Sequence, residues 1–194
     1  MTALLISTAD TDLLAAERSG APWRVANPAR VEAGRVPELL SGIDVAVVRL
    51  LGGRRTWPRG LDTVLASGIP TVVLGGEFAP DPELMAASTV PSGVAAEALA
   101  YLTEGGTTNL RELASFLSDT VLLTGLGFAP PAPFPLFGAH ERPSPASGPL
   151  PTDTPSPRVG IVYYRAHEHS GNTAFVDALC AAVVEAGGTP APVF

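Results

Sequence analysis

The feature that most constrains the fold is a strand pattern near the C-terminus that runs into a polar loop and then into an amphipathic helix. Residues 159–164, VGIVYY, form the apolar, β-favouring run of a parallel strand that is covered on both faces. The loop AHEHSGN follows, and its Ser170 and Asn172 are typical helix N-cap residues. Apolar residues then recur on one helical face, at Phe175, Leu179 and Val183 with Val176, Cys180 and Val184 beside them. This order predicts the opening of an α/β unit, in which ligands bind past the carboxyl end of a strand and at the N-terminus of a helix.

The region after residue 157 is too short to bury a core of its own. It has 37 residues, and segments below about 40 residues normally need a disulfide, a metal or a partner to stay folded. One strand, one helix and the start of a second strand at 192–194 are all that its pattern provides. We therefore expect 158–194 to be the truncated start of a second α/β domain, and the chain to be the amino-terminal part of a longer protein.

Residues 1–128 alternate between strand and helix patterns, which predicts an amino-terminal α/β domain. The expected architecture is a mostly parallel sheet with covering helices, Rossmann-like or flavodoxin-like. Strands are expected at 3–7, 23–25, 43–51 and 71–74, and helices at 11–17, 36–40, 58–66 and over much of 81–121.

Capping signals and glycines refine this prediction. Asp81 precedes a proline as a helix cap, and Asn109 with Glu112 has the spacing of a capping box. The third and fourth strands both end in a diglycine, at 52–53 and 75–76, which allows a sharp turn or a close approach of the backbone. Neither diglycine fits a dinucleotide fingerprint or a P-loop, so the sequence gives little support for nucleotide binding.

Proline dominates the segment that joins the two domains. Ten of the twenty prolines of the chain lie within 129–157, where they remove backbone donors and exclude helix or central strand. Residues 129–157 are therefore expected to be a proline-rich linker. Its apolar side chains are candidates for anchoring its first part to a surface, namely Phe134, Leu136 and Phe137.

Composition excludes several classes of function. The net charge is −7, and an acidic protein is poorly suited to binding a nucleic-acid backbone. No apolar run approaches the length of a membrane span, and no signal peptide is visible, so the expected location is cytoplasmic, with neither nucleic acid nor membrane as a partner. The one cysteine excludes an internal disulfide, and Cys180 is expected in the core.

Candidate binding residues cluster in the loop that follows the predicted second-domain strand. The histidines of this loop can bind metal or move protons near neutral pH, but two of them supply at most two ligands, so no metal site is predicted. An Arg165–Glu168 ion pair is possible. The candidate substrate-binding residues are Arg165, His167, Glu168, Ser170 and Asn172.

Two other groups of charged residues have simpler interpretations. Asp10 and Asp12 follow the first strand, where they could hold a cation or ligand, although helix capping explains Asp10 more simply. Four arginines, which could grip an anion, are better interpreted as part of a solvated loop: Arg49, Arg54, Arg55 and Arg59.

Several long stretches of this sequence resemble a known family. They are STADTDLLAAERSGAPWRVANPARV, DVAVVRLLGGRRTW, VVLGGEFAPDPELMAASTVPSGVAAEALAYLTEGGTTNL, FLSDTVLLTGLGF and VGIVYYRAHEHSGNTAFVDAL. Together they resemble the amino-terminal part of the CobN-type large subunit of aerobic cobaltochelatase, in the CobN/magnesium chelatase H-subunit family. The resemblance covers the chain except for the proline-rich linker.

The resemblance implies an ATP-dependent metal chelatase. The full protein would insert Co²⁺, its substrate, into the corrinoid hydrogenobyrinic acid a,c-diamide during cobalamin biosynthesis, and AAA+ ATPase partner subunits would use ATP and Mg²⁺. No cofactor is expected on this chain, no catalytic residue is carried over, and the chain alone is expected to be inactive. The alternatives are the magnesium chelatase H subunit, which acts on protoporphyrin IX, and a non-catalytic α/β binding module.

Overall fold

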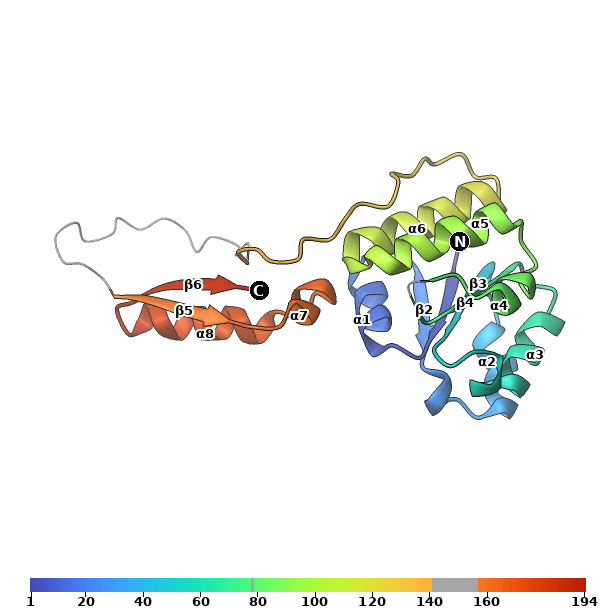
Figure 1. Ribbon diagram of the computed structural model, residues 1–194, viewed down its shortest axis with the longest axis horizontal. Coiled ribbons are helices and arrows are strands. Elements are labelled where there is room, and N and C mark those ends of the chain that lie inside the picture. The colour runs from blue at the N-terminus through green and yellow to red at the C-terminus, as the bar shows by residue number, and fades with distance from the viewer. Residues whose placement is uncertain (78, 141–156) are drawn as a thin grey trace. The chain divides into compact units, whose positions relative to one another are not determined.

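A computed structural model describes residues 1–77, 79–140 and 157–194 of the chain (Figure 1). The chain divides into two compact units, Met1–Phe134 and Pro135–Phe194. Each unit has its own sheet. Most of the expected linker, at 141–156, lies outside the described residues.

The first unit is built on a four-stranded parallel sheet. Its strands are β1 (Ala3–Ser7), β2 (Trp23–Ala26), β3 (Val45–Leu50) and β4 (Thr71–Gly75), in the order β2-β1-β3-β4. Every pair is parallel, as the strand–helix alternation predicts. β1, β3 and β4 are fully buried along their lengths, which explains why they appear in the sequence as continuous apolar runs.

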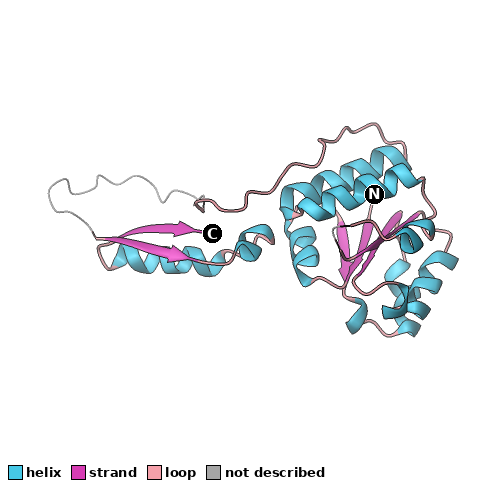
Figure 2. Cartoon of the chain, in the orientation of Figure 1, coloured by secondary structure: helices cyan, strands magenta, loops and turns pink. Residues whose placement is uncertain are grey.

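Helices cover both faces of this sheet (Figure 2). The helices are α1 (Asp10–Arg18), α2 (Val36–Leu40), α3 (Pro58–Ala66), α4 (Pro82–Ala86), α5 (Ser92–Glu104) and α6 (Gly106–Val121). Single turns of 3₁₀ helix occur at Pro28–Arg30, Ala33–Arg35 and Arg54–Thr56. Asp81 caps α4 as predicted, because its carboxylate accepts hydrogen bonds from the backbone N–H groups of Glu83 and Leu84.

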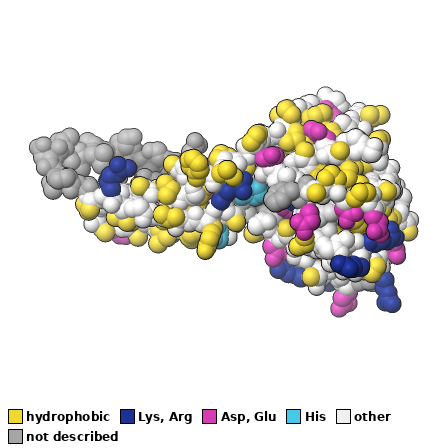
Figure 3. Space-filling model, viewed as in Figure 1, with side chains coloured by type: hydrophobic (Ala, Val, Ile, Leu, Met, Phe, Trp, Pro, Cys, Tyr) yellow, Lys and Arg dark blue, Asp and Glu magenta, His cyan; other side chains and the backbone are white. Residues whose placement is uncertain are grey.

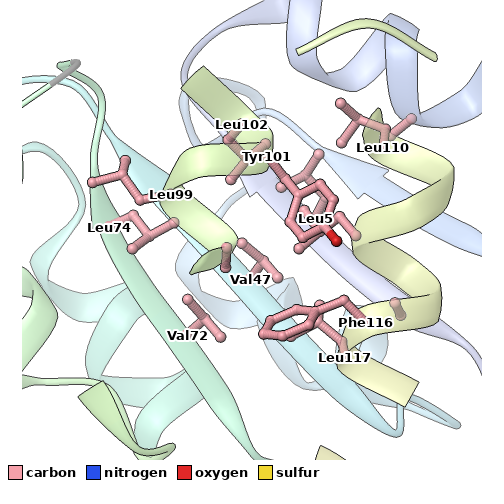
Figure 4. Packing of buried hydrophobic residues seen from close by; sticks show 14 of the residues in the cluster. Leu5, Val47, Val72, Leu74, Leu99, Tyr101, Leu102, Leu110, Phe116 and Leu117 are labelled. Atoms are coloured by element: carbon pink, nitrogen blue, oxygen red, sulfur yellow. The ribbon is translucent and has the colours of Figure 1, made fainter. Parts of the chain in front are cut away.

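Alternate residues of each strand supply two separate cores. Leu5, Val47 and Val72 face α1, α5 and α6, where Tyr101 and Phe116 complete the packing (Figure 4). Burial, together with the negative charges of Glu97 and Glu112, raises the pKa of Tyr101 to about 12. On the opposite face, alternate strand residues pack against α2, α3 and α4. The strands contribute Leu4, Ile6, Val48 and Val73, and the helices contribute Leu61 and Leu84. The fold predicted from the sequence is confirmed for this unit.

Asn109 and Glu112 do not form the predicted capping box. α6 begins at Gly106, so both residues lie inside the helix. The Asn109 amide accepts a hydrogen bond from the Ala132 N–H and donates one to the Ala132 carbonyl, and Glu112 accepts one from the Ala129 N–H. These polar side chains therefore hold the start of the proline-rich segment.

The second unit contains two parallel strands and two helices. They are β5 (Arg158–Val162), α7 (Arg165–His169), α8 (Ala174–Glu185) and β6 (Thr189–Val193). We define residues 135–140 as the edge segment, which runs antiparallel to β6 through a bridge between Ala139 and Val193. Leu136 and Phe137 were candidates for anchoring the linker to a surface. They do not anchor it, because each residue is 80% exposed.

The apolar face of α8 differs from the predicted one. Val176 and Cys180 are buried, and Cys180 is a core residue as expected, but Phe175 and Leu179 are 40% and 49% exposed. β5 was expected to be covered on both faces, yet within the described residues its Val162 is 82% exposed. Hydrophobic side chains are visible on the surface of this unit in Figure 3. Among the helices of the described residues, none is both long and apolar enough to cross a lipid bilayer.

Candidate functional site

The carboxyl edge of the first sheet is occupied by a buried ion pair. Arg49 of β3 and Asp12 of α1 have side chains only 8% and 6% exposed. The Nη1 atom of Arg49 lies 3.2 Å and 3.1 Å from the two carboxylate oxygens of Asp12. Asp12 also accepts a 2.7 Å hydrogen bond from the Ser7 hydroxyl at the end of β1. Both oxygens of the Asp12 carboxylate therefore have protein donors.

The guanidinium of Arg49 also binds three backbone carbonyls. It donates to the oxygens of Gly75, Gly76 and Leu102, at 3.4, 3.1 and 3.1 Å. The carboxyl ends of β1 and β3 are where parallel α/β sheets commonly bind ligands, and here the Arg49 guanidinium is bonded to protein groups at this edge. The interpretation of Arg49 as part of a solvated loop is wrong, because a charged group this deep must be paired to stay buried.

Three further charged candidates of the first unit, Asp10, Arg54 and Arg55, are also bonded within the protein. The Asp10 carboxylate accepts hydrogen bonds from Asn27 and Arg30 rather than capping α1, and these interactions, the Asn27 bond first, hold its pKa below the usual value. Arg54 pairs with Asp62, and Arg55 donates to the Gly52 carbonyl. The arginine cluster expected from the sequence is therefore divided among separate contacts.

A hollow at the carboxyl end of β5 is the strongest candidate site in the second unit. It has a volume of about 500 Å³, and four of its five lining residues carry rings. The Phe175 ring packs edge-on against Tyr163 and lies 4.9 Å from the His167 ring, centroid to centroid. Such a surface can pack against a flat, apolar ligand. Its lining residues are Val162, Tyr163, Tyr164, His167 and Phe175.

The five predicted site residues lie on or beside α7, but only His167 lines the hollow. Arg165 donates from Nε to the Pro135 carbonyl at 2.7 Å, so it is not the ion-pair partner of Glu168. Ser170 is buried and ends α7, and its hydroxyl donates to the His167 carbonyl at 3.3 Å. The Asn172 N–H donates to the same carbonyl at 2.7 Å.

Ser170 and Asn172 do not cap the following helix as predicted. α8 begins at Ala174, and the residue before it, Thr173, makes no side-chain capping bond. The short helix α7 was not predicted, and its formation leaves Ser170 and Asn172 to shape the turn between the two helices. Both residues therefore contribute a hydrogen bond to the turn after α7.

Sequence reasoning missed a polar network behind the hollow. Glu168 accepts a 2.6 Å hydrogen bond from the Tyr163 hydroxyl, and the same oxygen lies 3.0 Å from Nδ1 of His140. The other ring nitrogen of His140 lies 3.0 Å from Asp177 of α8. Burial, the Glu168 hydrogen bond and nearby negative charge raise the pKa of Tyr163, so its phenol stays protonated. Imidazole, carboxylate and phenol in contact can store and transfer a proton.

No metal site accompanies this network in the part of the chain that the structure describes. There, no group of three or more histidine, cysteine, aspartate and glutamate side chains is arranged to hold a metal ion. The two carboxylates bind opposite nitrogens of the His140 ring, so the three side chains do not converge on one point.

Comparisons with known proteins identify the family. Residues 99–194 match the family model described as CobN/Magnesium Chelatase. A solved structure, the catalytic subunit of cobaltochelatase from Mycobacterium tuberculosis, is 47% identical to this chain and superposes along all of it with a TM-score of 0.91. The chain belongs to the CobN/magnesium chelatase family.

Both relatives of this CobN/magnesium chelatase chain are much longer than it is. The aerobic cobaltochelatase subunit CobN of Pseudomonas aeruginosa is 27% identical over 179 residues, which cover 89% of this chain and 14% of that protein. The chain likewise covers 16% of the Mycobacterium structure. The comparisons confirm the α/β fold and the family that the sequence predicts. The relatives contain many residues that this chain does not match, so the activity of a whole chelatase is not assigned to these residues alone.

Proposed function

We propose that this chain is part of the large subunit of a cobaltochelatase, which inserts Co²⁺ into hydrogenobyrinic acid a,c-diamide in cobalamin biosynthesis. The observation that carries the proposal is the 47% identity to a cobaltochelatase catalytic subunit over the full length of the chain. The curated relative is also a cobaltochelatase subunit. Magnesium chelatase is the second candidate, because the family model includes it by name.

Partner subunits would supply the energy for metal insertion. The word subunit in the name of the Pseudomonas relative implies partners for that protein. We propose AAA+ ATPase partners in the cytoplasm, which hydrolyse ATP with Mg²⁺, because the sequence of this chain has no P-loop to bind ATP phosphates. The chain alone is then expected to show neither ATP hydrolysis nor cobalt insertion.

The second unit would be completed by further chain of the large subunit. Among the described residues no strand pairs with the outer edge of β5, and the face that carries Val162 and Tyr164 leaves both side chains 82% exposed. Parallel sheets are stable when helices cover both faces. The much greater length of the relatives is consistent with this proposal.

The hollow at β5 would contact the tetrapyrrole. Metal insertion requires the inner nitrogens of the macrocycle to lose protons as the metal sheds water, so a nearby proton acceptor is useful. His167 presents an imidazole to the hollow, and Tyr163 connects the hollow to the Glu168 carboxylate. Arg165, Ser170 and Asn172 would act by holding α7 and the turn after it in place.

Disruption of the reading frame that encodes this chain tests the proposed function. We expect loss of cobalamin synthesis and accumulation of hydrogenobyrinic acid a,c-diamide, with growth restored by added cobalamin. Accumulation of protoporphyrin IX with normal cobalamin would instead support the magnesium chelatase. Normal cobalamin synthesis without accumulation of either tetrapyrrole would overturn the chelatase proposal and favour a binding module.

A further inference from the structure

The edge segment is attached to β6 by backbone hydrogen bonds. The Gly138 N–H donates to the Phe194 carbonyl at 3.1 Å, and the Phe194 N–H donates to the Gly138 carbonyl at 3.0 Å. The His140 N–H donates to the Pro192 carbonyl at 3.2 Å. The segment thus forms a short antiparallel strand that places His140 over the carboxyl end of β6.

The His140 side chain joins three elements at one buried point. It is only 6% exposed, and its two nitrogens face Glu168 of α7 and Asp177 of α8. The third titratable neighbour is Tyr163, whose ring lies edge-on at 6.2 Å between centroids. Arg165 adds a second link from α7 to this segment through the Pro135 carbonyl.

Only the protonated ring satisfies this geometry. A neutral imidazole has one N–H donor and one acceptor nitrogen, whereas the imidazolium donates from both nitrogens. Deprotonation would leave one buried lone pair facing a carboxylate oxygen, which is a repulsive contact. An imidazolium would donate both of these 3.0 Å bonds and would thereby bridge α7 and α8.

The same network reaches the hollow. His140 and the Tyr163 hydroxyl share one oxygen of Glu168, and Tyr163 lines the hollow beside His167. A movement of Glu168 would consequently shift both Tyr163 and α7, which carries His167.

We propose that His140 is a positioning residue for the hollow: as an imidazolium it clamps α7 to α8 and to the edge segment, and loss of its proton releases this wall of the hollow. The proposal goes beyond the chelatase assignment, since it concerns the shape of the hollow and requires no ligand.

The pH dependence has a definite direction. Burial of the ring opposes protonation, but the hydrogen bonds and charges of Asp177 and Glu168 outweigh it and raise the pKa of His140 above 6.5. The clamp is therefore fully formed below about pH 6.5, and it is lost as the pH rises through the higher pKa of the folded state.

The proposal predicts a coupled titration that can be measured on the whole 194-residue chain. The ring-proton signal of His140, one of only three histidines, should titrate with a pKa above 6.5, and a His140→Gln variant would assign it. Exchange of the backbone amide hydrogens of Gly138, Phe194 and Ser170, corrected for its intrinsic pH dependence, should become about tenfold faster as the pH rises through this range. The reason is that hydrogen bonds to charged groups stabilise by about 1.5 kcal/mol.

Two variants of α8 separate positioning from a general effect of charge. Asp177→Asn removes one clamp partner and should lower the pKa of His140 and shift the exchange transition to lower pH. Glu185→Gln removes the same charge from an exposed position on the same helix and should change neither. His140→Gln should make the exchange of Ser170 fast at every pH.

Three results would overturn the proposal. One is a His140 pKa at or below 6.5 in the unmodified chain. Another is exchange at Gly138 and Ser170 that does not follow the His140 titration, and the third is an equal effect of Asp177→Asn and Glu185→Gln. The first two concern the unmodified chain, so they hold even if a variant fails to fold.

Discussion

Replacing Asp12 with alanine lowers the free energy of unfolding of the first unit by about 3–5 kcal/mol, because it leaves the Arg49 charge buried without its partner. Urea unfolding followed by tryptophan fluorescence measures the effect selectively, since both tryptophans of the chain, Trp23 and Trp57, belong to this unit. The expected result is a much lower transition midpoint at an unchanged slope.

An exposed ion pair provides the matched control for this prediction. Asp62 pairs with Arg54, but their side chains are 60% and 41% exposed. Asp62→Ala should therefore cost no more than about 1 kcal/mol. Equal losses for Asp12→Ala and Asp62→Ala would show that the Arg49–Asp12 pair is not a buried structural element.

A double variant distinguishes the ion pair from its separate parts. Arg49→Met should also destabilise the unit, because it leaves Asp12 buried and removes donors from the carbonyls of Gly75, Gly76 and Leu102. Combining Asp12→Ala with Arg49→Met should cost less than the sum of these two single changes, since neither charge is then left alone. Strict additivity would mean that the two side chains do not interact.

Gly76→Ala should destabilise the first unit by about 1–3 kcal/mol, the range typical of overpacking. A Cβ at this position would lie 2.6 Å from the Cα and 2.8 Å from the backbone nitrogen of Leu51, so main chain would have to move. The same movement would displace the Gly76 carbonyl that accepts a hydrogen bond from Arg49. The lower free energy of unfolding should be measurable by the same urea unfolding experiment.

Gly93→Ala is the control for the glycine prediction. Gly93 lies in α5 with open space around the position of a Cβ, so alanine should be neutral or stabilising by up to about 1 kcal/mol. Opposite signs at Gly76 and Gly93 are the expected outcome. A stable Gly76→Ala protein would mean that the second diglycine does not need its close approach to Leu51.

Local patterns predicted the first unit well. The bounds of β1, α2 and α3 agree with the structure. A short apolar run followed by polar residues marks β1, whereas proline near the start and glycine after the end mark α2 and α3. Arg49 was misinterpreted although it lies within the apolar run of β3, where a charged residue must be buried and paired. Its partner Asp12 lies 37 residues away, a separation that no local pattern reports.

The candidate site of the second unit was predicted only in part. The position of the loop followed from the strand–loop–helix pattern, and His167 does line the hollow. His140 was hidden because it lies in a proline-rich segment, and its partners Glu168 and Asp177 are 28 and 37 residues away. On α8 the apolar residues form two neighbouring rows, one beginning at Phe175 and the other at Val176. The sequence does not show which row is buried, and in the structure Val176 and Cys180 are the buried residues.

The most direct test of the central claim is a titration of the ¹⁵N-labelled chain with hydrogenobyrinic acid a,c-diamide, followed by NMR. If the hollow at β5 contacts the tetrapyrrole and the Arg49–Asp12 pair closes the crevice of the first sheet, chemical shifts should change around 162–175 and stay constant at 7–12, 49–53 and 75–77. Changes at the first-sheet crevice, or no change at the hollow at saturating corrinoid, would contradict the account.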